Sequence, residues 1–314
     1  AAHLLSGHSY HHQALEEALA AFTGQQRVLL FSSGYQANLG VIDGLMGRDD
    51  VVIQDKLNHA SLLDGSRLSE ATLQRYRHGD IAGLARRLRA AEQVQHKLIV
   101  TDGVFSMDGD IAPLAEIMAL ADSEACAVLV DDAHGFGVLG ETGRGTLSHL
   151  GLQNQMPIEV GTFGKAFGTA GAFVAADEVV IEMLIQQSRT FVYTTAQPAA
   201  LAAATLASLQ LVQQEQWRRD KLAMLIKQFR QGVAALGLQL MSSETPIQPI
   251  VLGDVERVMQ YSDALEERGI LVGAIRPPTV SEGAGRLRVT LSAAHEEADV
   301  FELVAALEAV TCTL

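Results

Sequence analysis

The chain has 314 residues, of which 48% are hydrophobic, and a formal net charge of −14 at pH 7. This length is sufficient for one large domain and a smaller one, each with a buried core. The acidic balance argues against nucleic acids and anionic membranes as partners, because both favour proteins with basic patches.

The first 190 residues alternate helical and strand patterns, which predicts an α/β domain with a mostly parallel sheet covered by helices. The expected elements are, in chain order, a helix over 11–22, a strand over 28–31, a helix over 34–46, strands over 51–54 and 98–101 around a helix over 81–91, a helix over 114–121, strands over 127–130, 160–162 and 171–175, and a helix from Asp177 through Gln187.

A long helical pattern follows from Pro198 to about Leu236 and is expected to bridge two domains. Beyond it, strands over 247–251, 270–274 and 287–291 alternate with helices over 255–268 and 296–310. We therefore expect a large domain over residues 1–235 and a small α/β domain over residues 236–314.

Three features bear on location. No apolar run reaches the roughly 18 residues of a membrane-spanning helix. The two cysteines, Cys126 and Cys312, are too few for a disulfide framework and favour a reduced, cytoplasmic protein. The first eight residues lack a starting Met and a basic region, so we expect no signal peptide and a natural N-terminal segment ahead of residue 1.

The most informative residues are one lysine and the end of one strand. Lys165 lies between glycines in a small, apolar segment that is expected to solvate it poorly. Asp131 ends an apolar strand, where ligands of open α/β sheets bind, and His134 follows it. A desolvated amine beside an acid and an imidazole is the set that a pyridoxal phosphate (PLP) enzyme needs. Taken singly, Lys165 also fits a surface lysine and Asp132 a turn cap.

Other segments carry weaker signals. The start of the helix at Gly34 and Tyr35 suits an anion such as a phosphate, without the lysine of a P-loop. His59 could stack on a cofactor ring or relay a proton, or simply lie beside a helix cap. Ser106 precedes a tight turn and is expected to face a site. Arg276 lies in a proline-stiffened segment and could clamp a carboxylate.

Six spaced motifs together resemble the α-oxoamine synthases, which are fold-type I PLP-dependent transferases of the aspartate aminotransferase-like fold. The motifs that carry this resemblance lie at residues 33–35, 58–61, 103–110, 131–135, 162–165 and 275–280. They follow the family's order over essentially the whole chain. The family also has an N-terminal arm of several dozen residues on the acyl-CoA side of its site, and this sequence does not contain it.

The resemblance implies a role for each motif residue toward the cofactor and the substrate. Lys165 would form the Schiff base, Asp131 would face the pyridine nitrogen, His134 and Ser106 would contact the phenolic oxygen, His59 would stack on the ring, Gly34 and Tyr35 would line the phosphate side, Thr162 would bond the phosphate, Thr195 would reach the phosphate of the neighbouring subunit in a homodimer, and Arg276 and Thr279 would hold substrate.

The resemblance further implies decarboxylative condensation of L-alanine with pimeloyl-CoA, or with a pimeloyl carrier protein, in biotin biosynthesis. Lys165 and His59 would be catalytic, with His59 as the acid for the thioester oxygen and no metal involved. Residues 276–280 and 286–291 favour this reaction over another of the family, such as that of glycine C-acetyltransferase.

Two interpretations from other classes remain open. Some family members are non-catalytic partner subunits, but those lack the Schiff-base lysine that Lys165 would supply. A metal-dependent hydrolase could instead be built on Asp131, Asp132, His134 and His59. An absorption band of the bound cofactor that disappears in Lys165→Ala would exclude the hydrolase.

Overall fold

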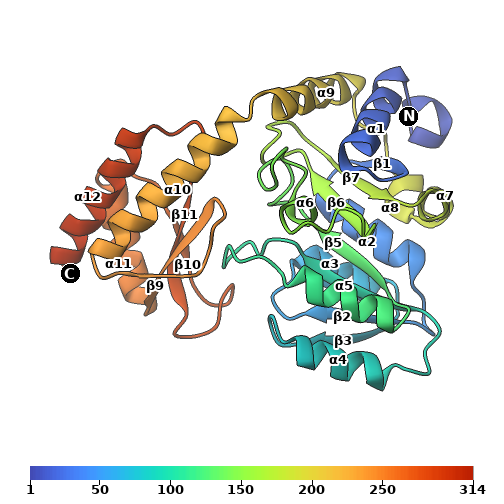
Figure 1. Cartoon of the computed structure of the whole chain (residues 1–314), viewed down its shortest axis with the longest axis horizontal. Coiled ribbons are helices and arrows are strands. Elements are labelled where there is room, and N and C mark those ends of the chain that lie inside the picture. Colours follow the sequence, from blue (N-terminus) through green and yellow to red (C-terminus); the bar gives the residue numbers. More distant parts are fainter. Residues whose placement is uncertain (314) are drawn as a thin grey trace. The chain divides into compact units, whose positions relative to one another are not determined.

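The computed structural model describes residues 1–313, which form two compact units (Figure 1). Unit 1 consists of Ala1–Val104 and Ala112–Gln214, and unit 2 of Phe105–Ile111 and the residues from Glu215 onward. The division therefore falls about twenty residues before the boundary expected at residue 235.

The single helix expected over 198–236 is two helices, α9 (Ala199–Gln214) and α10 (Trp217–Ala235). Glu215 and Gln216 form the break between the two helices. Neither residue is a glycine or a proline, so the sequence pattern did not mark the break.

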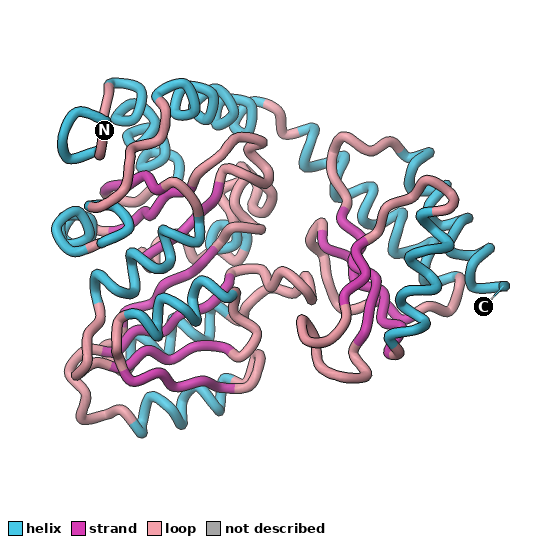
Figure 2. The backbone as a smooth tube through the Cα atoms, turned by 180° about the vertical axis from the view of Figure 1, so that it is seen from behind, coloured by secondary structure: helices cyan, strands magenta, loops and turns pink. Residues whose placement is uncertain are grey.

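Unit 1 contains a seven-stranded sheet in the order β1-β7-β6-β5-β4-β2-β3 (Figure 2). Its strands are β1 (Arg27–Phe31), β2 (Val51–Asp55), β3 (Thr72–Tyr76), β4 (Lys97–Asp102), β5 (Ala127–Asp131), β6 (Ile158–Thr162) and β7 (Ala172–Ala176). The pairs from β3 through β6 are parallel, and β7 is antiparallel to both β1 and β6. The predicted mostly parallel sheet is confirmed.

Helices bury both faces of this sheet. The helices of unit 1 besides α9 are η1 (His3–Gly7), α1 (Tyr10–Thr23), α2 (Gly34–Leu45), α3 (Ala60–Leu68), α4 (Ile81–Ala90), α5 (Leu114–Ser123), α6 (Thr146–His149), α7 (Glu178–Gln187) and α8 (Arg189–Val192). In β1, Leu29 and Phe31 pack with α2, α3, α7 and α8, whereas Val28 and Leu30 pack with α1 and α9. Successive strand residues point to opposite faces, so continuous apolar runs reflect this double cover.

Five elements of unit 1 were not predicted from the sequence, namely η1, α3, β3, α6 and α8. β3 reads Thr-Leu-Gln-Arg-Tyr and lies at the edge of the sheet, where only Tyr76 is fully buried. An edge strand needs no apolar run, so its pattern resembles a loop. α3 begins at Ala60, directly after its N-cap His59, whose ring accepts a hydrogen bond from the Ser61 N–H.

Unit 2 contains a four-stranded antiparallel sheet in the order β10-β11-β9-β8. Its elements besides α10 are β8 (Gln239–Leu240), β9 (Ile247–Gly253), α11 (Val255–Glu266), β10 (Gly273–Ile275), β11 (Gly285–Thr290) and α12 (Glu297–Thr313). α11 lies on the sheet, and α12 packs on α10 and α11.

The segment Phe105–Ile111 belongs to unit 2 although it interrupts the sequence of unit 1. The buried Arg286 guanidinium donates to Asp108 Oδ1 at 2.6 Å, and Ser243 Oγ donates to the Gly109 carbonyl at 2.9 Å. Gly109 has a φ of 74°, which fits the tight turn expected there.

Three parallel strands of unit 1 end in acidic residues at the same edge of the sheet. Asp55, Asp102 and Asp131 end β2, β4 and β5, and Asp102 lies in register with Asp131. Ligands of open α/β sheets bind at this carboxyl edge.

Over residues 1–313, no helix combines the length and the apolar character that crossing a membrane would require.

Candidate active site

A line of hydrogen bonds runs from Asp131 to His59 across the carboxyl edge of the sheet. Asn38 Nδ2, on α2, donates to Asp131 Oδ2 at 2.6 Å and to Ser61 Oγ at 2.8 Å. Ser61 Oγ in turn lies 2.7 Å from His59 Nδ1. Asp131, Asn38 and Ser61 are buried, whereas His59 is exposed. The structure thus joins two predicted site residues through Asn38 and Ser61, to which the sequence analysis gave no role.

This line fixes the tautomer of His59. Nδ1 accepts from the Ser61 N–H at 3.3 Å, and Ser61 Oγ, which already accepts from Asn38, can donate its proton to the same nitrogen. The proton of the neutral ring therefore lies on Nε2, at the outer end of the imidazole. An exposed Nε2–H is a donor available to a bound molecule.

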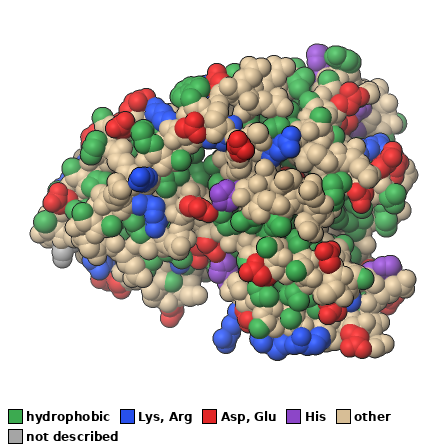
Figure 3. All heavy atoms as spheres, viewed as in Figure 1, with side chains coloured by type: hydrophobic (Ala, Val, Ile, Leu, Met, Phe, Trp, Pro, Cys, Tyr) green, Lys and Arg blue, Asp and Glu red, His purple; other side chains and the backbone are tan. Residues whose placement is uncertain are grey.

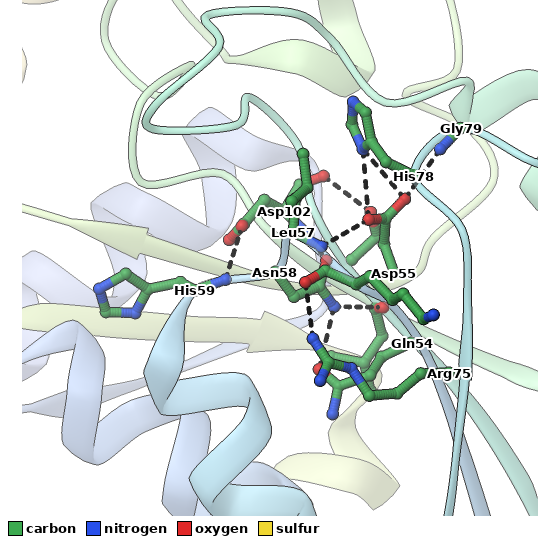
Figure 4. Close-up of polar contacts among 12 residues, drawn as sticks. Gln54, Asp55, Leu57, Asn58, His59, Arg75, His78, Gly79 and Asp102 are labelled. Atoms are coloured by element: carbon green, nitrogen blue, oxygen red, sulfur yellow. Dashed lines mark hydrogen bonds and ion pairs between the residues drawn. The ribbon is translucent and has the colours of Figure 1, made fainter. Parts of the chain in front are cut away.

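Asp102 holds the backbone next to this ring, because the His59 N–H donates to Asp102 Oδ2 at 2.8 Å (Figure 4). Burial raises the pKa of Asp102 well above its usual range, and the neighbouring Asp131 carboxylate raises it further. The Lys165 ammonium acts on that pKa in the opposite direction, so Lys165 lies within electrostatic reach of this edge. Asp102 was not predicted as a site residue, although it directly follows the strand expected over 98–101 and ends β4 in the structure.

The turn between β2 and α3 is fixed by further polar contacts, drawn in Figure 4. Asn58 Nδ2 donates to the Val100 carbonyl at 2.8 Å, and the buried Asp55 carboxylate accepts from the Leu57 N–H at 2.8 Å. His78 Nδ1 lies 3.2 Å from Asp55. His59 is therefore presented from a braced turn.

Lys165 lies in the turn between β6 and β7, and the structure differs here from the expectation that the segment desolvates it. In this chain Lys165 is exposed, because Phe163 and Phe167 occupy the core beneath the turn. The segment is apolar because of these two phenylalanines. His134, in the loop after β5, is half-buried.

The end of β6 and the start of α2 form a close pair suited to a phosphate. Thr162 Oγ1 is buried and has no hydrogen-bond partner among the described residues 1–313. A Cβ at Gly34 would come within 2.6 Å of Thr162 Cγ2. The first N–H groups of α2 lack acceptors within the helix, so they can bind an anion. The Tyr35 hydroxyl donates to Asp64. At the start of α2, Tyr35 would therefore contact a phosphate through its backbone.

Asp132 differs from its neighbour Asp131, because its carboxyl group holds the loop after β5 in place. It is fully buried, and its two oxygens accept from the N–H and the hydroxyl of Thr146. Burial raises the pKa of Asp132 to about 7. With both oxygens so engaged, Asp132 is not presented to a ligand, which disfavours the metal-dependent hydrolase.

Four predicted residues lie outside this edge or in unit 2. Thr195 is exposed in the loop after α8 of unit 1. Ser106, Arg276 and Thr279 belong to unit 2. The Ser106 carbonyl accepts from Arg288 at 2.6 Å, and the Thr279 N–H donates to the Arg276 carbonyl at 3.0 Å.

Comparison with known proteins identifies the family. The family model described as aminotransferase class I and II matches residues 3–307. The chain belongs to this family. An 8-amino-7-oxononanoate synthase of Nitrosococcus oceani is 60% identical over 308 residues, which are 98% of this chain and 81% of that protein. The 8-amino-7-oxononanoate synthase of Alkalilimnicola ehrlichii is also 60% identical, over 98% of this chain and 78% of its own length.

Solved structures give the same fold. The serine palmitoyltransferase of Sphingomonas wittichii has a TM-score of 0.96 and 34% identity, over 99% of this chain and 79% of that one. The 8-amino-7-oxononanoate synthase of Francisella tularensis has a TM-score of 0.83 and 32% identity, over 98% and 88%. Within the aminotransferase family the chain is therefore an α-oxoamine synthase, as its motifs predicted.

Proposed function

We propose that this chain is a PLP-dependent acyltransferase that condenses L-alanine with a pimeloyl thioester, releasing the thiol, CO₂ and 8-amino-7-oxononanoate for biotin biosynthesis. The observation that carries the proposal is the 60% identity, over 98% of the chain, to an 8-amino-7-oxononanoate synthase. The carboxyl edge of the unit 1 sheet supports it, because the residues there fit the cofactor at both ends.

The fit to the cofactor rests on two features of this edge. The buried Asp131 carboxylate, held by Asn38 and by the Ala133 N–H at 3.0 Å, suits a protonated pyridine nitrogen. The unpartnered Thr162 Oγ1 beside the start of α2 suits the phosphate. Bound there, PLP supplies a ring that accepts the electron pair left at the amino-acid Cα.

Lys165 is the residue for the covalent link and for the Cα proton. Its amine lies on the turn that follows Thr162, and its charge reaches Asp102 on the same edge. With PLP and an amino acid bound, the unlinked amine of Lys165 would take the Cα proton. His134 and Ser106 are proposed to contact the phenolic oxygen of the cofactor.

His59 is proposed both to stack on the cofactor ring and to act as the acid toward the thioester oxygen. Its outer Nε2 carries the proton, because Nδ1 accepts from the Ser61 N–H. A positioned imidazole of this kind contributes about 10²- to 10⁴-fold to a rate. In unit 2, Arg276 is proposed to bind the carboxylate of alanine, with Thr279 beside it.

We further propose a homodimer in which Thr195 reaches the phosphate site of the neighbouring subunit. Thr195 is exposed in this chain, which leaves it available to a second copy. We propose that the reaction takes place in the cytoplasm, a reducing compartment that suits the two free cysteines, Cys126 and Cys312.

Turnover by the purified holoenzyme tests the assignment. We expect CO₂ release and 8-amino-7-oxononanoate from L-alanine with pimeloyl-CoA, and at least about 10-fold lower kcat/KM from glycine with acetyl-CoA. The reverse preference would assign the reaction of glycine C-acetyltransferase. A protein without activity on either pair, and without an absorption band from bound PLP, would be a non-catalytic subunit.

A further inference from the structure

Three histidines near the N-terminus of unit 1 pack against one another. The rings of His3, His8 and His12 have centroids 5.3–5.6 Å apart, and His3 also stacks on Phe191 of α8 at 5.2 Å. In Figure 3, histidine side chains lie at the surface where Figure 1 places α1 and the N-terminus. The three rings therefore connect η1 and α1 to the segment around α8.

His12 is the most buried of the three, and both of its ring nitrogens are engaged. Nδ1 accepts from the Ser9 N–H at 3.1 Å, which is part of a capping box at the start of α1. The proton of the neutral ring therefore lies on Nε2, which donates to the Gln197 carbonyl at 2.8 Å. This hydrogen bond joins two segments that lie 185 residues apart in the sequence.

The side chain of Gln197 is fixed as well. It is buried, and its Nε2 donates to the carbonyl of Phe31, the last residue of β1. It also lies against Gly171, which directly precedes β7, because a Cβ at Gly171 would come within 1.9 Å of the same nitrogen. Gln197 is thus held by the ends of two strands and by α1.

These contacts hold the loop that carries Thr195. Gln197 follows Thr195 by two residues, and the Ala196 N–H between them donates to the Ala1 carbonyl at 3.0 Å. Thr195 itself is exposed. A group that is already held in its binding position loses less conformational entropy when it binds. The loop is therefore suited to presenting the Thr195 hydroxyl to another molecule.

We propose that His12 is a positioning residue, which through the Gln197 carbonyl holds the loop that presents Thr195 to the phosphate of PLP in a neighbouring subunit. This inference rests on the proposed function, in particular on the homodimer and the role given there to Thr195. Without the imidazole donor, the buried Gln197 carbonyl would lose its partner, and the loop would have to move to recover one.

The test compares two substitutions of His12 with a matched control on the same helix. In His12→Leu, the leucine occupies the space of the ring but offers no donor. In His12→Gln, the amide can keep both contacts, because a glutamine at this position of a capping box accepts from the cap N–H and retains an NH₂ group for Gln197. His11→Leu, at an exposed neighbour on α1, is the control.

The readout is the affinity for PLP, measured without substrate by titrating the apo form of the full chain and following the absorption band of the bound cofactor. We expect Thr195→Ala to weaken PLP binding about 10-fold, because a hydrogen bond to the charged phosphate is lost. We expect His12→Leu to weaken it about 3- to 10-fold. His12→Gln and His11→Leu should both remain within about 2-fold of the wild type.

A double variant separates positioning from a general effect on stability. If His12 acts through Thr195, adding His12→Leu to Thr195→Ala should weaken PLP binding by less than about 2-fold further. The melting temperature should instead fall by the same amount with His12→Leu in either background. Equal losses of PLP affinity in both backgrounds would overturn the proposal. So would wild-type affinity in His12→Leu, or a loss in His12→Gln as large as that in His12→Leu.

Gln197→Met provides a second variant in case His12→Leu does not fold. The methionine occupies similar space and removes the hydrogen bond to the Phe31 carbonyl, so we expect weaker PLP binding that again depends on Thr195. Unchanged affinity in Gln197→Met, or in Thr195→Ala, would overturn the inference. Absence of 8-amino-7-oxononanoate from the wild type would instead reject the proposed reaction, and PLP binding would still decide the role of His12.

Discussion

The two units prepare for chemistry in opposite ways. On unit 1, Asp131, Asn38 and Ser61 are buried, and each is hydrogen-bonded to the next. On unit 2, Arg276 and Thr279 are exposed, and the Arg276 guanidinium makes a long hydrogen bond to the Ala274 carbonyl, at 3.4 Å.

This contrast separates two tasks. Groups that face developing charge must be held in place in advance, because rearrangement during the reaction costs rate. Groups that recognise a small substrate can remain solvated until the substrate arrives. We therefore expect changes at Asp131, Asn38 and Ser61 to act on kcat and on stability, and changes at residues 276–279 to act on KM.

The largest effect is expected for Lys165→Ala. Loss of the amine that forms the covalent link should lower turnover by at least about 10³-fold and remove the absorption band of the bound cofactor. The exposed Lys227 provides a matched control, and Lys227→Ala should retain activity within about 2-fold. A persistent absorption band in Lys165→Ala would contradict the assignment.

The paired acids sharpen the comparison within unit 1. Asp131→Asn should lower kcat by about 10²-fold or more, because it removes the charge facing the ring nitrogen. Asp132→Asn should instead lower the free energy of unfolding by about 1–3 kcal/mol, because Thr146 loses one of its two acceptor oxygens. Thermal melts and steady-state rates of both variants decide this, and an exchange of the two phenotypes would reverse the roles.

Asn38→Ala tests whether the hydrogen-bond line acts as a unit. It removes the donor to two buried oxygens, so we expect a loss of about 1–3 kcal/mol in stability and of roughly 10-fold in kcat. The pH–rate profile should also shift, because Ser61 then orients the His59 ring less well. Asn154→Ala, at an exposed asparagine, serves as the control. A fully active Asn38→Ala would show that the line is only structural.

Arg276→Lys tests the exposed substrate-binding residues of unit 2. Loss of the planar donor pair should raise the KM for alanine by about 10-fold and leave the melting temperature unchanged. Arg268→Lys, exposed in the same unit, should alter neither. A change in kcat without a change in KM would mean that Arg276 does not bind the ground-state carboxylate.

The smallest effect concerns stability alone, at Glu16 on α1. Burial raises the pKa of Glu16 to about 7, so the folded state favours its neutral form. The stability that this form contributes is complete below about pH 4.5 and is lost as pH rises to about 7. Glu16→Gln should therefore exceed the wild type in unfolding free energy by about 1–3 kcal/mol at pH 8 and not at pH 4.5. Glu17→Gln, at an exposed neighbour, should show no such difference.

The sequence predicted the fold class because apolar strands followed by polar residues mark the carboxyl edge of a parallel sheet, as at Asp131. It did not predict that Asn38 and Ser61 would connect Asp131 with His59. Their meeting depends on the strand order, which places β4 between β2 and β5. Periodicity reports which face a residue lies on and carries no information about that order.

Two further differences have equally local causes. An apolar segment around Lys165 indicated burial, but Phe163 and Phe167 account for that character. β3 escaped detection because an edge strand has only one side chain, that of Tyr76, fully enclosed. Patterns of residue type therefore predict elements with two covered faces better than those with one.

The short piece Phe105–Ile111 has a consequence for synthesis and for excision. Its ion pair joins Asp108 to Arg286, which the ribosome adds 178 residues later. During translation, most of the remaining chain is therefore synthesised before Asp108 can form its ion pair with Arg286. No single cut in the polypeptide can release unit 2 whole, since a peptide beginning at Glu215 would leave this seven-residue contribution behind.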